Sequence, residues 1–258
     1  MSFRLCLIFQ IVVLLFSACT HEPPPAADVK PQKDIATPTE IYVASGAGYR
    51  KPVDELKDLF ESQTHITVNC IYGNMRQITT QAQSGGKISV VIGDVKFLKK
   101  TTIHFKKEIL IGKGKLVIAV DRTQPFGAVD ELANPQLGRI IVPDSQKAIY
   151  GRAAYETLKN LNIFDEVQSR LITVQTVPQV TSYLASGTAQ IGFMNRTDFL
   201  SLDQKRFDSV DIDQSLYTPI FIAAALTPQS TEAAEQYMQF IQSEVARKVF
   251  NKYGLGLD

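Results

Sequence analysis

Cysteine is scarce in this chain, with three residues among 258. Cys6 and Cys19 lie in the first twenty residues, which leaves Cys70 as the single cysteine of the remaining sequence. One thiol cannot form a bridge within a domain, so an internal disulfide is excluded as a source of stability. Cys70 stands in a strand-like stretch, residues 66–72, where a buried and inert thiol is expected.

Histidine is equally rare, and His21, His65 and His104 are far apart in the sequence. None of them stands at metal-ligand spacing from a cysteine or a carboxylate, so we expect no metal site. The chain also lacks a Gly-x-Ser-x-Gly elbow, a Walker-type phosphate loop and a His-Glu-x-x-His pair. These absences argue against an enzyme and predict no cofactor, with an enzyme on a similar fold as the competing hypothesis.

A surplus of basic residues is absent too. Lys and Arg number 27 against 26 Asp and Glu, and removal of the first 18 residues would take away Arg4 alone. A nucleic-acid-binding protein needs excess positive charge to meet phosphates, so this class is excluded. The short runs Lys99-Lys100 and Lys106-Lys107 are interpreted as solvated helix surface. A small ligand or a protein partner fits this balance, and we expect a monomer.

The first residues have the pattern of an export signal. Arg4 precedes an apolar run, Leu5 to Phe16, which is too short for a permanent membrane span and ends in small residues. Phe16-Ser17-Ala18-Cys19 then resembles a bacterial lipobox, although Leu is more usual than Phe three places before the cysteine. The pattern predicts a lipoprotein signal peptide over residues 1–18 and lipidation of Cys19. An ordinary signal peptide is the alternative.

Residues 19–40 predict a tether. Five prolines lie between His21 and Glu40, among Ala, Lys, Asp and Thr. Proline lacks a backbone donor and favours extended conformations, so this stretch cannot form a packed core. An exported protein held at a membrane and facing the periplasm or the cell exterior fits both segments.

The remaining chain alternates short apolar runs with amphipathic segments. Strands are predicted at 41–44, 66–72, 90–92, 116–120, 139–142, 172–174, 191–194 and 220–226. Helices are predicted after Pro52 and over 152–161, 178–185 and 231–253. This alternation predicts an α/β fold with largely parallel sheets covered on both faces.

Three strand-to-helix junctions are candidates for a binding site. They lie at 44–52, at 72–77 and at 145–152, and small residues are frequent in the first. In open α/β sheets, ligands gather where strands end and helices begin, because helix N-termini offer free N–H donors. A single such turn is weak evidence, but three of them favour an anion-binding cleft.

The chain resembles the periplasmic molybdate- and tungstate-binding family. The resemblance starts at Gly46-Ala47-Gly48-Tyr49-Arg50-Lys51-Pro52 and Tyr72-Gly73-Asn74. It continues through Gly93-Asp94, Gly151-Arg152-Ala153-Ala154 and residues 184–192, and it closes with Phe250-Asn251-Lys252-Tyr253-Gly254. It covers residues from about Ile41 to the end, and the order of the motifs carries it more than any one of them.

The resemblance implies a type II periplasmic-binding-protein fold, with two α/β lobes around a ligand cleft. Residues 41–120 and 217–258 would form the first lobe and residues 121–216 the second. The implied partners are a small tetrahedral oxyanion, molybdate or tungstate, and an ABC permease in the membrane. The implied site consists of hydroxyl and backbone N–H donors at Gly48, Asn74, Met75, Arg76, Tyr150, Val177 and Asn195.

Three of these positions depart from the family pattern. Gly48 stands where Ser is frequent, Arg76 lies in a loop that is usually rich in Ser or Gly, and Asn195 replaces an aromatic residue. A guanidinium at Arg76 could compensate for lost hydroxyl donors, or it could point into solvent. The departures leave two alternatives open: binding of another anion such as sulfate or phosphate, and a degenerate protein acting as an envelope sensor or interaction module.

Overall fold

The computed structural model describes residues 40–257. The predicted signal peptide, Cys19 and all of the predicted tether except Glu40 lie outside the described residues. Within residues 40–257, none of the helices has both the length and the apolar character needed to span a bilayer.

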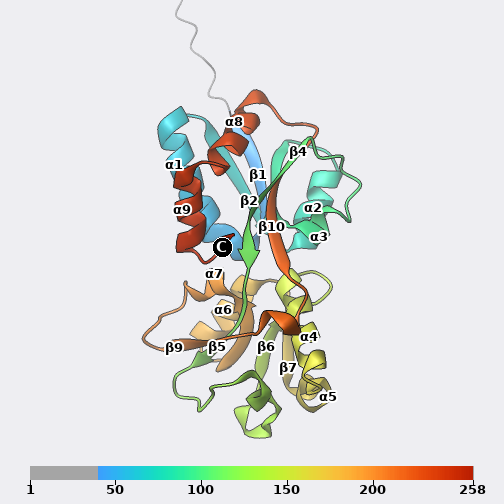
Figure 1. Ribbon diagram of the computed structural model, residues 1–258, viewed down its shortest axis with the longest axis vertical. Coiled ribbons are helices and arrows are strands. Elements are labelled where there is room, and N and C mark those ends of the chain that lie inside the picture. The colour runs from blue at the N-terminus through green and yellow to red at the C-terminus, as the bar shows by residue number, and fades with distance from the viewer. Residues whose placement is uncertain (1–39, 258) are drawn as a thin grey trace, which may run out of the picture. The chain divides into compact units, whose positions relative to one another are not determined.

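Two five-stranded sheets organise the described chain (Figure 1). The first sheet has the order β2-β1-β3-β10-β4. Its strands are β1 (Glu40–Gly46), β2 (Thr67–Gly73), β3 (Ile88–Asp94), β4 (Lys107–Gly114) and β10 (Ile220–Leu226). The second sheet has the order β7-β6-β8-β5-β9. Its strands are β5 (Leu116–Asp121), β6 (Ile140–Pro143), β7 (Leu171–Val174), β8 (Ile191–Asn195) and β9 (Phe207–Asp211). We refer to the sheets and their helices as the first and second lobes.

Each sheet is mixed, whereas the sequence predicted largely parallel sheets. In the first lobe β2, β1 and β3 run parallel, and β10 pairs antiparallel with both β3 and β4. In the second lobe β7, β6 and β8 run parallel, and β5 pairs antiparallel with β8 and β9. The reversed strand of each lobe, β10 or β5, is the one that the chain forms directly after a passage into that lobe, whereas β4 and β9, which lead into the passages, run with the parallel strands.

Helices cover both faces of each sheet. In the first lobe α1 (Arg50–Thr64), α8 (Glu232–Ile241) and α9 (Glu244–Lys252) lie on one face, and α2 (Met75–Gln83) and α3 (Val95–Leu98) on the other (Figure 1). In the second lobe α4 (Ile149–Asn160) and α5 (Phe164–Val167) lie on one side, and α6 (Val177–Ala185) and α7 (Arg196–Phe199) on the other.

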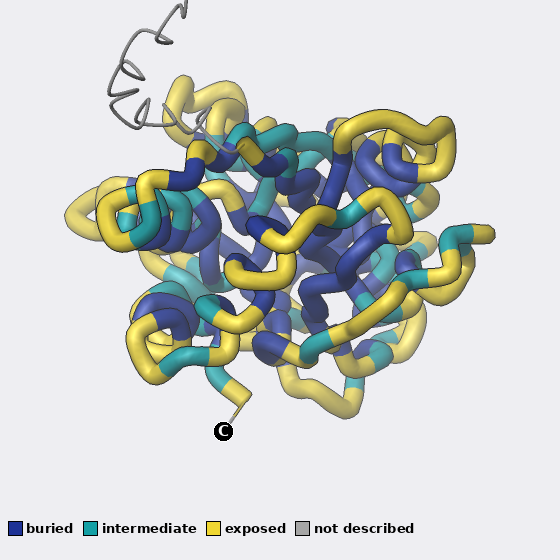
Figure 2. Tube along the Cα trace, turned by 90° about the horizontal axis from the view of Figure 1, so that it is seen from above, coloured by how far each residue is buried: buried dark blue, intermediate teal, exposed yellow. Residues whose placement is uncertain are grey.

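The core lies between these layers. Every residue of the central strands β3 and β8 is buried, as expected for strands covered on both faces. Figure 2 shows the buried segments in the interior and the exposed ones in the loops around it. On α1, the buried residues Val53, Leu56 and Phe60 recur at the spacing of a helix that packs one face on a sheet.

The passages between the lobes are short, and the first lies earlier than the sequence predicted. The predicted boundary followed Val120, but β5 already belongs to the second sheet, so the chain changes lobe at Lys115. The return lies between β9 and β10. The two passages touch, because the N–H of Leu116 donates to the hydroxyl of Tyr217 at 3.1 Å.

The predicted helix 231–253 is two helices rather than one. The chain leaves helical conformation at Ser243, whose φ and ψ are −67° and 160°. The hydroxyl of Ser243 accepts from the N–H of Ala246 at 3.2 Å and caps α9. A serine that caps a new N-terminus satisfies backbone donors that a continuous helix would have paired within itself.

Candidate functional site

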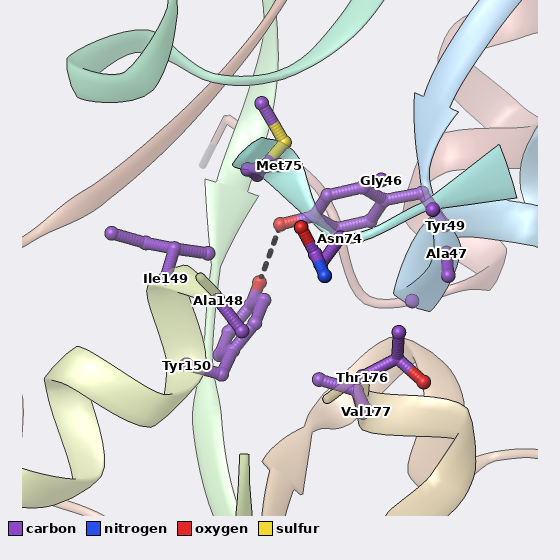
Figure 3. Close-up of a pocket in the computed structure, with 12 residues that line it drawn as sticks. Gly46, Ala47, Tyr49, Asn74, Met75, Ala148, Ile149, Tyr150, Thr176 and Val177 are labelled. Carbon is purple, nitrogen blue, oxygen red and sulfur yellow. Dashed lines mark hydrogen bonds between the residues drawn. The ribbon is translucent and has the colours of Figure 1, made fainter. Parts of the chain in front are cut away.

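A small cavity lies where the strand ends of the two lobes face each other (Figure 3). Its volume is about 30 Å³. A single water needs about 10–15 Å³ of such space, so the cavity suits a ligand of a few heavy atoms. The first lobe contributes Gly46, Ala47, Gly48, Tyr49, Gly73, Asn74 and Met75, and the second Ala148, Ile149, Tyr150, Thr176 and Val177.

Three helices begin at this cavity. Met75 is the first residue of α2, Ile149 and Tyr150 open α4, and Val177 opens α6. The first N–H groups of a helix have no partner within it and carry a partial positive charge. Three helices of nine, twelve and nine residues therefore direct their positive ends at one small space. This arrangement suits an anion.

Asn74 holds the start of α2 and keeps one donor unused. Its Oδ1 accepts from the N–H of Gln77 at 2.9 Å, and its own N–H donates to Oε1 of Gln77 at 3.0 Å. This reciprocal capping fixes the loop. No hydrogen bond within residues 40–257 involves Nδ2 of Asn74, and Figure 3 shows the side-chain amide facing the space beside Tyr49 and Tyr150.

Met75 contributes to the cavity mainly through its position on the backbone. It is 3 % exposed and belongs to the apolar cluster beneath α2. A Cβ added at Gly93 would lie 2.3 Å from Cε of Met75, so the thioether occupies the space above a glycine of β3. The side chain thereby fixes the start of α2 against the sheet, and Met75 lines the cavity as the first residue of α2.

Two tyrosines meet at the cavity, one from each lobe. The hydroxyl of Tyr49 donates to the hydroxyl of Tyr150 at 3.0 Å, as Figure 3 shows. The two side chains are almost completely buried. Burial is the main cause that raises the pKa of both phenols above the ordinary value, so both are neutral donors at physiological pH. Tyr49 was not among the predicted site residues, although it lies in the predicted Gly-rich junction.

Asn195 joins the lobes and does not line the cavity. It is fully buried, and its Oδ1 accepts from the N–H of Asp198 at 3.3 Å as the cap of α7. Its Nδ2 donates to the carbonyl of Gly48 at 2.9 Å. The amide donor that the sequence assigned to a ligand is therefore used on the backbone of the first lobe.

Arg76 lies at the rim, outside the cavity. Its side chain is exposed and borders a separate open groove with Asn74, Gln77, Lys147 and Gln175 among others. Of the predicted site residues, the structure brings together Gly48, Asn74, Met75, Tyr150 and Val177, and it does not bring Arg76 and Asn195 into the same lining. The cavity wall consists of neutral residues.

The described residues show no grouping of three or more His, Cys, Asp or Glu that could hold a metal ion. Besides Tyr49, the unpredicted members of the wall are mostly small residues, namely Gly46, Ala47, Gly73 and Ala148, together with Ile149 and Thr176. Each lies within or beside a predicted junction or site residue, so the junctions locate them more closely than any side-chain motif does.

The chain is similar to several solute-binding proteins. It is 28% identical over 231 residues to the molybdate-binding protein ModA of Rhodobacter capsulatus, covering 83% of this chain and 87% of that protein. It is 24% identical over 230 residues to a putative ABC transporter substrate-binding lipoprotein of Bacillus subtilis, covering 83% and 85%. The fold matches the periplasmic molybdate-binding protein of Azotobacter vinelandii with a TM-score of 0.77 at 22% identity, covering 84% and 99%.

These likenesses confirm the predicted family resemblance and the two-lobed α/β fold. The model of a family described as bacterial extracellular solute-binding protein matches residues 41–256, which is nearly all of the described chain. The chain therefore belongs to the family of bacterial extracellular solute-binding proteins.

Proposed function

We propose that this protein captures a small tetrahedral oxyanion, molybdate or tungstate, in the cavity between its lobes and delivers it to an ABC importer. The observation that carries the proposal is the convergence of α2, α4 and α6 on a cavity of about 30 Å³ with neutral walls. The names of the molybdate-binding relatives support the choice of anion.

The proposed ligand contacts are fixed, neutral donors. The backbone N–H groups of Gly48, Met75 and Val177 and the hydroxyl of Tyr150 would surround the anion, with Nδ2 of Asn74 as a further donor. A dianion that leaves water loses much hydration energy, and hydrogen bonds from several directions must offset that loss. Bonds to a charged acceptor are about twice as strong as neutral ones. Donors held by helix starts need little reorganisation when the ligand arrives.

We also propose that the protein is exported and held at the membrane by a lipid on Cys19. The apolar run ending at Ala18 and the proline-rich stretch that follows support this, and the related protein from Bacillus subtilis is named a lipoprotein. A tethered binding protein stays close to the permease that it would supply.

A thermal-unfolding screen with molybdate, tungstate, sulfate, phosphate and chromate tests the choice of ligand. A ligand that binds the folded form alone stabilises it by about 2.7 kcal/mol at a hundredfold excess over Kd. We expect a clear rise in Tm with molybdate and tungstate. A rise with sulfate or phosphate alone would reassign the ligand. No rise with any anion, in protein freed of ligand by unfolding and refolding, would overturn the proposal.

A further inference from the structure

Two buried polar atoms without a partner among residues 40–257 come from opposite lobes. They are Oδ2 of Asp94, at the end of β3, and Nη2 of Arg152, on α4. Asp94 is 1 % exposed, and its other oxygen, Oδ1, accepts from the N–H of Phe97 at 3.1 Å. Buried polar atoms in folded proteins are almost always hydrogen-bonded, so a pair of opposite sign calls for a physical explanation.

Arg152 reaches across the boundary between the lobes. Its guanidinium carbon lies 6.0 Å from the ring centroid of Phe97, in the helix that Asp94 caps. Figure 1 shows α3 and α4 on the same side, one in each lobe. Burial raises the pKa of Asp94, and the positive charge of Arg152 acts in the opposite direction. The two groups interact through space without forming a direct ion pair.

The other side of Arg152 connects to the passage between the lobes. Its Nε lies 3.7 Å from Oε1 of Glu156, one turn further along α4. Oε2 of Glu156 accepts from the N–H of Thr218 at 2.7 Å. Thr218 lies in the return passage just before β10. The charge of Arg152 therefore acts on a carboxylate of the first lobe, while its contact with Glu156 connects it to the segment about which the lobes would turn.

The cavity lies beside this connection. Tyr150 is two residues before Arg152, and the charge of Asp94 raises the pKa of both Tyr49 and Tyr150. Lys96, an exposed residue of α3, also acts on Asp94 through its charge. The carboxylate of Asp94 therefore acts on both tyrosines of the cavity wall, and the charges of Arg152 and Lys96 act on the carboxylate.

We propose that Arg152 and Asp94 interact across the boundary through one bound water and that this interaction keeps the lobes closed over the ligand. Moving the lobes apart would expose Oδ2 of Asp94 and Nη2 of Arg152 to bulk water, whereas both atoms are buried in the structure. Desolvated opposite charges are stable only when they pair, directly or through one bound water. The pair would therefore oppose opening and slow release of the ligand. The part of the inference that concerns ligand release rests on the proposed function.

Hydrogen exchange of the ligand-free protein, expressed from the full-length gene, tests the pair without any anion. The variants are Asp94→Asn, Arg152→Gln and the double variant. We expect exchange at residues 147–152 and 217–220 to be at least about fivefold faster in each single variant, because opening becomes more frequent. The double variant should exchange no faster than either single one, as expected for residues that act together.

Lys57→Gln is the matched control, since Lys57 lies 3.6 Å from Glu61 in an ion pair within α1 alone. It should leave exchange at both segments unchanged. Wild-type exchange in the Asp94→Asn and Arg152→Gln variants would overturn the inference. Additive effects in the double variant, or faster exchange spread evenly over both lobes with a lower Tm, would overturn it too.

A second measurement uses molybdate. We expect dissociation to be about tenfold faster in Asp94→Asn and Arg152→Gln, with association within about twofold of wild type. If wild type binds molybdate and the variants release it at the wild-type rate, the closing role is wrong and the proposed function stands. If wild type binds no anion, the proposed function fails, and the exchange measurement still decides whether the pair holds the lobes together.

Discussion

The hydroxyl of Tyr49 donates to the hydroxyl of Tyr150, and this bond of 3.0 Å joins the two lobes at the cavity wall. Because Tyr150 accepts in this bond, its own hydroxyl hydrogen is left to donate elsewhere. A Cβ at Gly114 would lie 2.1 Å from the same oxygen, so the glycine that ends β4 makes room for it. The position of the hydroxyl thus depends on the first lobe, on the second and on the passage between them.

Tyr150→Phe tests this hydroxyl as a ligand donor. Removal of one hydrogen bond to a charged acceptor is expected to cost about 1.5–3 kcal/mol of binding, or roughly 10-fold to 150-fold in Kd. Titration calorimetry with molybdate measures the change. Tyr155→Phe is the control on the same helix, because the ring of Tyr155 packs on Phe164 at 5.6 Å. Equal affinity in the Tyr150→Phe variant and in wild type would remove this hydroxyl from the site.

Arg76→Ala tests the role of the rim. Since Arg76 is exposed and outside the cavity, its charge can attract an approaching anion but does not hold the bound one. We expect association to slow by about twofold to fivefold at low ionic strength, with the difference lost near 0.5 M salt as screening shortens the range of the charge. Stopped-flow kinetics measure both rates. A dissociation rate that rises tenfold would instead make Arg76 a direct ligand.

Gly93→Ala tests the close approach of Met75. The added methyl would lie 2.3 Å from Cε and 2.4 Å from Sδ of Met75. Overpacking of this kind costs about 1–3 kcal/mol of the free energy of unfolding, measured by denaturant titration. In a Met75→Ala background, Gly93→Ala should cost less free energy of unfolding, because the thioether that the added methyl would contact is then absent.

The control for this change is Gly127→Ala, where the nearest atom to an added Cβ lies 3.8 Å away. We expect that variant to have the stability of wild type. A neutral Gly93→Ala variant would show that Met75 moves aside freely and does not fix the start of α2.

Strands buried on both faces are recognised in the sequence as continuous apolar runs. The predicted runs at 220–226 and 116–120 match β10 and β5 closely. The two strands missed are β4 and β9, which lie at the edges of their sheets. Edge strands need fewer apolar residues, and β4 carries three charges and two glycines while β9 has the sequence FDSVD. The missed strands are also those that lead into or out of the passages, so the first passage was misplaced.

The candidate site, like the set of strands, was predicted only in part from the sequence. Backbone positions at strand-to-helix junctions follow from local sequence, and Gly48, Asn74, Met75, Tyr150 and Val177 share one cavity wall. Side-chain directions depend on partners far along the chain. The amide of Asn195 bonds to a carbonyl 147 residues away, which no local pattern contains.

Cys19→Ser tests the anchor. If a lipid on Cys19 holds the protein at the membrane, the variant should lose the lipid and move from the membrane fraction to the soluble fraction. Metabolic labelling with a radioactive fatty acid and fractionation measure both properties. Cys70→Ser serves as the control, since Cys70 is a partly buried free thiol of the folded part. Unchanged labelling and membrane retention in Cys19→Ser would show that the lipobox interpretation is wrong.

The buried carboxyl of Asp94 should make the free energy of unfolding depend on pH. Burial raises the pKa of this carboxyl above its ordinary value of about 3.9, while the N–H of Phe97 and the charges of Arg152 and Lys96 only partly oppose the shift. An acid whose pKa is higher in the folded state binds its proton more tightly there than in the unfolded chain. Its contribution to stability therefore falls as the pH rises from about 3.9 through the folded-state pKa.

Asp94→Asn removes this contribution and leaves the cap of α3 an oxygen acceptor. The free energy of unfolding of wild type minus that of the variant should decrease as the pH rises above about 4, and it should level off above the folded-state pKa of Asp94. Denaturant titrations at a series of pH values measure this difference. Asp58→Asn is the control, because the Asp58 side chain is 75 % exposed on α1. A difference that stays constant from pH 4 to 7 would mean that the folded protein does not disfavour the ionised form of Asp94.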